Sequence, residues 1–197
     1  LGRPETDEIR GMAMTVLGNS LSSARRDEDA LAVREAELST LRRLGASEQD
    51  LLVTQGNLAN SYEALGRHEE AILIKRDVYY GNLRLNGNEH YDTIREAFNY
   101  ANSLAGLQRF EEAKSLSRKT IPVARRVLGE GALITLSMRG IYAQSLYEDN
   151  GTTLDDLREA VATLEETERT ARRVLGGAHP LTEVIEDHLH ESRAVLR

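Results

Sequence analysis

The chain has 197 residues, of which 40% are hydrophobic and 29% are charged, as in an ordinary folded, soluble protein. Its 25 basic and 32 acidic residues leave a net charge of −7, which argues against nucleic acid as a partner, because phosphate binding needs a basic surface. The absence of cysteine excludes disulfides and thiolate metal sites, and no apolar run approaches the roughly 18 residues of a membrane-spanning helix. We therefore expect a cytoplasmic protein without a membrane partner.

Helical elements follow one another along the sequence, separated by short turns. We expect helices over residues 5–23, 27–44, 48–65, 69–86, 92–107, 110–128, 132–147, 154–175 and 180–196. Gly45 is predicted to close the second helix in the left-handed conformation. Pro122 lacks a backbone N–H and is predicted to kink or interrupt its helix. The last helix is highly polar on one side, which suits a cap on a helical array.

A repeat of about 42 residues groups these helices into pairs. Small residues that open a recurring four-residue motif lie at Gly18, Ala59, Ala101 and Ala143. An alanine follows twelve residues later in three units, and five residues late in the fourth, at Ala30, Ala71, Ala113 and Ala160. Glycines separate the units at Gly45, Gly87, Gly129 and Gly176. These markers predict one array over residues 1–197, with units at about 3–45, 46–87, 88–129 and 130–176 and a capping helix at about 180–196.

This pattern of small residue, large residue and later alanine resembles the tetratricopeptide repeat. The period is longer than the usual one of about 34 residues. The junctions LGGAHPLT at 175–182 and NGNEHYDT at 86–93 are similar to those of kinesin light chain. The resemblance implies an all-α fold, a right-handed α-solenoid superhelix of four helix–turn–helix units plus a C-terminal capping helix. It also implies that the small residue of each first helix packs against the alanine of the second.

The same resemblance places the first helix of each unit on a concave groove. Two groove positions per unit, two before and one after the small residue, carry mostly side-chain amides, which can both donate to and accept from a peptide backbone. The candidate peptide-binding residues are Asn19, Asn57, Asn60, Arg95, Phe98, Asn99, Asn102, Gln144 and Tyr147. Arg95 is the basic member and would favour an acidic group. The alternative is that these amides hydrogen-bond neighbouring helices within the array.

Metal binding and catalysis find little support in the sequence. Glu186 and His190 lie one helical turn apart and could touch one ion, but His188 is expected to point elsewhere, and no HExxH pattern is present. The sequence contains no nucleophile elbow, phosphate-binding glycine loop or dinucleotide fingerprint. We therefore expect neither an enzyme nor a cofactor or metal site.

Two functions remain open at this stage. The first is a protein-interaction scaffold that binds a peptide segment of a partner, with cargo-adaptor work implied by the resemblance to kinesin light chain. The second is a structural or regulatory spacer, a sensor segment of a larger protein, or an array that self-associates into a homo-oligomer.

Overall fold

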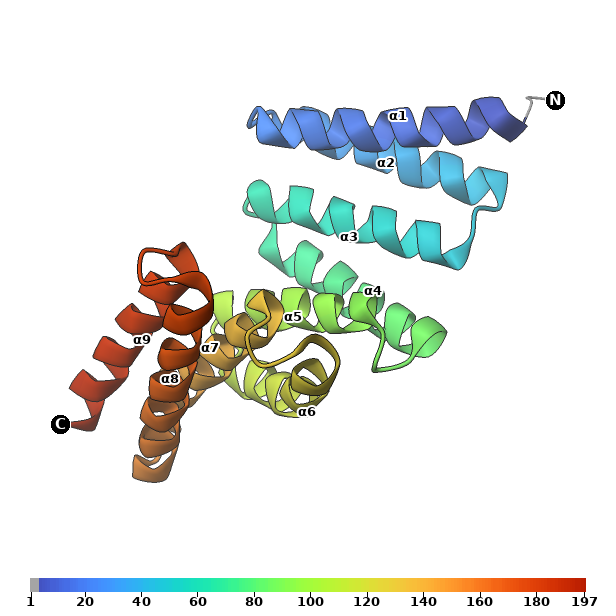
Figure 1. Ribbon diagram of the computed structural model, residues 1–197. Coiled ribbons are helices and arrows are strands. Elements are labelled where there is room, and N and C mark those ends of the chain that lie inside the picture. The colour runs from blue at the N-terminus through green and yellow to red at the C-terminus, as the bar shows by residue number, and fades with distance from the viewer. Residues whose placement is uncertain (1–3) are drawn as a thin grey trace. The chain divides into compact units, whose positions relative to one another are not determined.

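A computed structural model describes the backbone of residues 4–197 and the side chains of residues 9–197. The predicted start of the first repeat, at residue 3, lies outside these limits. The described residues form nine α-helices and no strand (Figure 1). The helices are α1 (Pro4–Ser23), α2 (Asp27–Leu44), α3 (Glu48–Ala64), α4 (His68–Asn86), α5 (Tyr91–Gly106), α6 (Phe110–Leu128), α7 (Leu133–Tyr147), α8 (Leu154–Leu175) and α9 (Pro180–Leu196). None of them is long and apolar enough to cross a membrane. The all-α prediction is confirmed.

Local capping explains where several helices begin and end. Gly45 follows α2 with φ 67° and ψ 36°, so the predicted left-handed cap is confirmed. His90 and His179 precede α5 and α9, and in each case imidazole Nδ1 accepts a hydrogen bond from the backbone N–H two residues later, at 3.2 and 3.1 Å. Thr153 and Asp156 form a reciprocal capping box at the start of α8. The two histidines therefore hold helix ends.

Pro122 does not interrupt its helix, so that part of the prediction is wrong. α6 runs without a break from Phe110 to Leu128 with Pro122 inside it. A proline in a helix interior removes one hydrogen bond to the carbonyl four residues earlier, here that of Arg118. Pro122 and Arg118 are both exposed, so the freed carbonyl lies on a side of α6 that water can reach. Solvation of this carbonyl is the simplest reason why the helix tolerates the proline.

The repeated small residues are buried within the helical array. The described alanines of the repeat are all fully buried, at 0% exposure: Ala30, Ala59, Ala71, Ala101, Ala113, Ala143 and Ala160. Gly18, which takes the alanine's place in α1, is also buried. A methyl group or a hydrogen at these positions lets two helix backbones approach closely, as tetratricopeptide packing requires.

The chain divides into two compact units, residues 1–85 and 86–197. In the first unit, Leu31, Leu38 and Leu58 form a small apolar core. In the second unit, a larger core of buried residues from α7, α8 and α9 includes Leu136, Leu146, Leu164 and Ile185. The second unit therefore has the more extensive apolar packing.

The two compact units also differ at the residue four positions after the alanine in the second helix of each repeat. These residues are all buried, at 6% exposure or less: Arg34, Lys75, Ser117 and Leu164. Arg34 on α2 donates to the backbone carbonyl of Asn57 at 2.9 Å and also bonds Ser61, so it links α2 to α3. Lys75 on α4 pairs with Glu63 on α3 at 2.5 Å. The first unit thus buries charged groups where the second buries a hydroxyl and a leucine.

Burial lowers the pKa of the Arg34 guanidinium, although the nearby charges of Glu37 and Asp27 oppose this shift. An arginine guanidinium nevertheless remains protonated in proteins, so Arg34 stays charged at neutral pH. The first unit therefore carries a permanent buried cation.

The turn between α3 and α4 allows the left-handed backbone conformation of Gly66 to be tested. Gly66 has φ +73° with open space around it, a conformation that side chains rarely adopt. Gly66→Ala is expected to lower the free energy of unfolding by about 1 kcal/mol, because an L-residue is strained in the left-handed region. Denaturant unfolding followed by circular dichroism measures the change.

Gly106→Ala is the matched control for that variant. Gly106 also has open space for a Cβ, but it is helical and its φ is ordinary. It should gain up to about 0.5–1 kcal/mol, because alanine favours helix over glycine. Equal effects of the two substitutions would contradict the conformational explanation.

Candidate peptide-binding faces

In the second compact unit, residues 86–197, three helices lie side by side, because α5 packs against α7 and α7 packs against α9. Helices α5 and α7 are the first helices of their repeats, and we call a helix in this position a first-type helix. Asn99 and Asn102 lie on α5, and Gln144 and Tyr147 lie on α7, as the predicted helix boundaries require. We call the surface that carries these residues the unit-2 face.

The amides of the unit-2 face differ in how far they are already engaged. Asn102 is exposed, and no described residue hydrogen-bonds its amide. Asn99 is half-buried and donates to Glu96 Oε2 at 3.0 Å, and Gln144 donates to Glu148 Oε1 at 3.1 Å. Asn102 is therefore the amide of this face best placed to accept from and donate to a ligand.

Arg95 does not present an isolated positive charge. Its Nη1 lies 2.8 Å from Asp92 Oδ1, and its Nε donates to Glu96 Oε1 at 2.9 Å. Its guanidinium also lies over the ring of Tyr91, 5.8 Å from the centroid. Burial alone would lower the pKa of Arg95, but the Glu96 hydrogen bond and the two carboxylates raise it overall. The carboxylates of Asp92 and Glu96 thus offset the positive charge of Arg95, which was expected to favour an acidic group. Phe98, on the same helix, is half-buried.

Tyr147 is buried rather than open to a ligand, with 7% of its surface exposed. Its hydroxyl donates to Glu191 Oε2 at 2.8 Å and lies 2.6 Å from His188 Nδ1. Because the hydroxyl has one proton, the imidazole Nδ1 is the donor in that arrangement. Desolvation, the Glu191 hydrogen bond and the charge of Glu148 together raise the pKa of Tyr147 well above its usual value.

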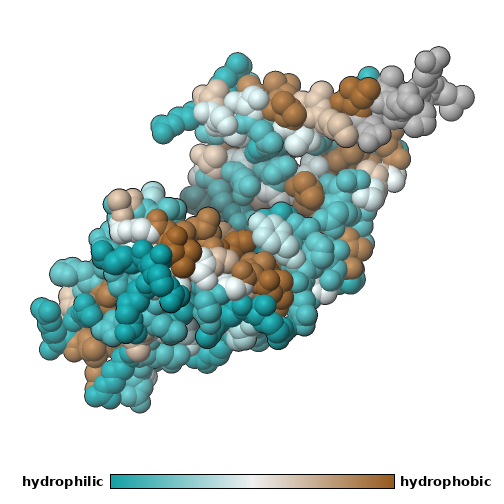
Figure 2. Space-filling view, in the orientation of Figure 1, coloured by the Kyte–Doolittle hydropathy of each residue, from teal (hydrophilic) through white to brown (hydrophobic). Residues whose placement is uncertain are grey.

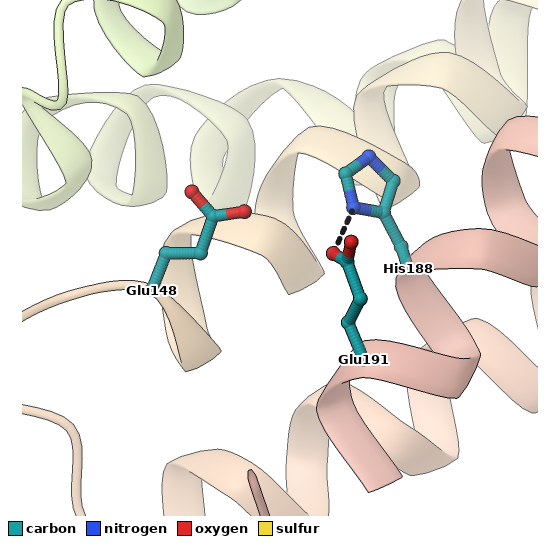
Figure 3. Close-up of side chains that lie close together, drawn as sticks. All are labelled: Glu148, His188 and Glu191. Atoms are coloured by element: carbon teal, nitrogen blue, oxygen red, sulfur yellow. Dashed lines mark ion pairs between the residues drawn. The ribbon is translucent and has the colours of Figure 1, made fainter. Parts of the chain in front are cut away.

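The end of α7 and helix α9 bring together two carboxylates and an imidazole, those of Glu148, Glu191 and His188 (Figure 3). One ligand-type atom each from Glu148, His188 and Glu191 lie within 4.8 Å of one another, with His188 Nδ1 3.8 Å from Glu191 Oε2. Glu186 and His190, paired in the sequence analysis, are not part of this group. Glu186 instead forms an ion pair with Arg172 of α8.

Helix α9 has the register of the first helix of a repeat, which was not expected from the sequence. His90 and His179 cap α5 and α9 in the same way, and buried serines, Ser103 and Ser192, follow thirteen residues later in both. In this register His188 corresponds to Asn99, and Glu191 to Asn102. The histidine and threonine that the two junctions share were the signal from which this correspondence could have been predicted.

The first unit carries the remaining predicted residues on what we call the unit-1 face, formed by α1 and α3. Asn19 on α1 is exposed and accepts a hydrogen bond from Arg34 Nη2 at 3.1 Å. Asn57 is half-buried and Asn60 is exposed, both on α3. No described residue hydrogen-bonds either of these two amides, although Arg34 binds the Asn57 carbonyl. Asn60 therefore has the same environment as Asn102.

A pocket of about 360 Å³ opens beside the unit-1 face, among α1, α2 and α3. Its lining residues are Gly11, Met12, Thr15, Glu37, Leu41, Asp50, Val53 and Thr54. The walls are mixed, with apolar side chains beside two carboxylates.

Comparisons with known proteins agree with this architecture. The tetratricopeptide repeat family model matches residues 99–131, from the end of α5 through α6 to the next junction. The nearly identical TPR-like repeats of a Podosopora anserina kinesin light chain have been solved as a crystal structure carrying one substitution. That structure has a TM-score of 0.81 at 19% identity, over 98% of this chain and 89% of its own. A second structure of these repeats gives a TM-score of 0.77 at 19% identity, over 99% and 89%.

A more distant similarity is to BtubC (BKLC) of P. vanneervenii, with a TM-score of 0.74 at 15% identity, over 93% of this chain and 72% of that protein. No curated protein sequence matches this chain at a significant level. The chain therefore has the all-α solenoid fold of tetratricopeptide-repeat arrays. Its resemblance to the repeats of kinesin light chain is confirmed at the level of that fold.

Tyr147→Phe tests the α7–α9 cluster. At neutral pH the variant should lose about 1–2 kcal/mol of unfolding free energy, because Glu191 and His188 lose a shared partner. A tyrosine whose pKa is raised on folding stabilises the protein below its unfolded value of about 10, and this stabilisation is lost as the pH rises further. The stability gap between wild type and variant should therefore narrow above about pH 10. Urea unfolding at pH 7 and at alkaline pH measures it, and a gap independent of pH would contradict the raised pKa.

Proposed function

We propose that the chain is a non-enzymatic protein-interaction module that binds an extended peptide segment of a partner protein. Tetratricopeptide repeats are generally protein-interaction modules, and the fold identifies the chain as such an array. The observation that carries the proposal is a pair of exposed amides at equivalent positions of two repeats, Asn60 and Asn102, which no described residue engages.

An exposed amide at this position suits recognition of a peptide backbone. It offers two donors and one acceptor, so it can replace water around a backbone carbonyl or N–H group without reading the side chains. Asn57 and Asn99 lie three residues earlier, close to one turn away on the same helices, and extend each face. Each unit therefore has its own peptide-binding face, and a cargo-adaptor role is the form of this function that the resemblance favours.

The double variant Asn60→Ala, Asn102→Ala tests this function. A peptide-library pull-down with wild type should first enrich a sequence, which is then synthesised and titrated. Each face loses one amide, so binding of the peptide to either face should weaken about fivefold, because one hydrogen bond contributes about 1 kcal/mol. Both residues are exposed and no described residue engages their amides, so the variant should keep the circular dichroism spectrum of wild type.

Asn88→Ala is the matched control, an exposed asparagine in the junction before α5. It should bind the enriched peptide as wild type does. If the double variant and the control bind equally well, the site lies elsewhere and the amides have no role in binding. If wild type enriches no peptide at all, the interaction function itself is contradicted.

Self-association is the second candidate function, and the surface of α1 favours it. Ile9, Met12 and Val16 are 66%, 60% and 65% exposed and lie at a spacing that places them on one side of the helix. Apolar residues are visible over α1 in the space-filling view (Figure 2). An exposed apolar stripe of this kind is typical of a surface that another protein or a second copy covers.

Sedimentation velocity of Ile9→Lys, Val16→Lys against wild type tests the second candidate. If α1 mediates dimerisation, two lysines on the stripe should weaken it by at least about tenfold, because burying each charge costs more than about 1 kcal/mol. Ala32→Lys, at an exposed position of α2, is the control for added charge. A wild-type protein that stays monomeric at high concentration would eliminate this candidate.

A further inference from the structure

The pocket beside the unit-1 face contains a feature that neither helix packing nor the amides explain. Glu37 of α2 lines it and is buried, with only 3% of its surface exposed. Thr15 of α1 donates a hydrogen bond to one carboxylate oxygen, Oε1. The other oxygen, Oε2, is buried and has no hydrogen-bond partner among the described residues.

The buried cation closest to Glu37 in sequence is near enough for the two charges to attract, but it makes no direct contact with the carboxylate. Arg34 lies three residues earlier on α2, yet its guanidinium is directed to Asn19, Asn57 and Ser61. No ion pair within 4.0 Å joins Arg34 or any other described cation to Glu37. The carboxylate therefore has one hydroxyl donor and lacks a counter-ion in contact.

Such an arrangement disfavours the folded state unless something else compensates for it. A buried carboxylate normally has a paired cation or several donors, because removing it from water without them is costly. A buried polar group without a partner calls for an explanation, and functional sites are one place where such groups occur. Glu37 also lines a pocket, so there is space for a ligand group beside its carboxylate, and the side chains that cover Oε2 have to move aside for a donor to reach that oxygen.

The composition of the pocket indicates what that group is. Met12, Leu41 and Val53 supply apolar walls, and Asp50 supplies a second, exposed carboxylate. A long aliphatic stem with a cationic head fits such walls, because the stem packs on apolar side chains while the head reaches the carboxylates. The guanidinium has five donors in a planar fork, so one group can serve more than one acceptor.

We propose that this pocket receives an arginine side chain of the partner peptide, with Glu37 as its principal acceptor. Met12 and Val53 precede Val16 and Asn57 by one helical turn, so the pocket lies along the unit-1 face. The inference rests on the proposed peptide-binding function, which it makes more specific, since it adds a preference for a basic residue. It predicts selectivity through the charge of one peptide side chain, whereas the amides bind the backbone.

The three methionines of the chain provide a direct assay. Met12 lines the pocket, Met14 lies on the same helix without lining it, and Met138 is buried in the second unit. Nα-acetyl-arginine N-methylamide is added to the protein labelled at its methionine methyl groups, and NMR records the three signals. We expect a saturable shift of the Met12 signal alone.

Charge is tested with the citrulline analogue, which has nearly the same shape but no positive charge, and with Glu37→Gln, which has nearly the same shape but no negative charge. Either change should weaken the affinity measured from the Met12 shift at least about tenfold, since the charge-assisted hydrogen bond is lost. Glu28→Gln, at an exposed site on the same helix, should leave it unchanged. The Met14 and Met138 signals report whether Glu37→Gln keeps its fold. Glu37→Asp is a second variant, which keeps the charge and shortens the side chain.

The proposal is overturned if arginine produces no shift at Met12, if citrulline shifts it equally, or if Glu37→Gln responds as wild type does. Asn60→Ala, Asn102→Ala should respond normally in this assay, because it leaves the pocket intact. Failure of the backbone-binding function and failure of the arginine pocket can therefore be told apart.

Discussion

Close approach of paired helices at small side chains is the constraint on which the structure depends. Seven alanines with no exposed surface occupy these contacts, and Gly18 occupies the eighth. A larger side chain at any of them would push two helices apart, since protein interiors have little free volume to absorb it. Because this contact recurs once per repeat, it also aligns the residues around it. The amide positions and the buried position four residues after the alanine therefore recur with the same period.

This dependence explains why the fold could be predicted and parts of the site could not. Backbone requirements leave residue signatures, so the alanine spacing, the glycine junctions and the left-handed cap at Gly45 were all readable. Exposure of Asn60 and Asn102 also follows from helical register. Side-chain pairing leaves no such signature. The engagement of Arg95 by Asp92 and Glu96, and the burial of Tyr147 against α9, depend on rotamers and on contacts between helices that sequence spacing does not specify.

The departures from expectation have physical causes of the same kind. Pro122 was expected to kink or interrupt α6, and it does not interrupt the helix, because its position on an exposed side leaves the lost hydrogen bond to solvent. The last helix was expected to be a cap because it is highly polar on one side. The structure adds that it has the register of the first helix of a repeat, with an exposed His190 at the position of the small residue. Its first-type register emerges only when the capping histidines are aligned. Polar residues on α9 therefore have two explanations, a solvated side and a continuation of the unit-2 face.

The buried charges of the first unit have a consequence for its motions. Ionic and hydrogen-bonded contacts such as those of Arg34 and Lys75 stabilise less than the apolar packing around Leu164, because each charge has first to be desolvated. In repeat arrays, stability is roughly a sum of local terms, so segments with weaker terms open more often. Amide hydrogen exchange in α2 would then proceed through local openings more often than in the part of α8 around Leu164. A partner that inserts a side chain beside Glu37 would close those openings, and part of its binding free energy would appear as slower exchange in this half of the protein.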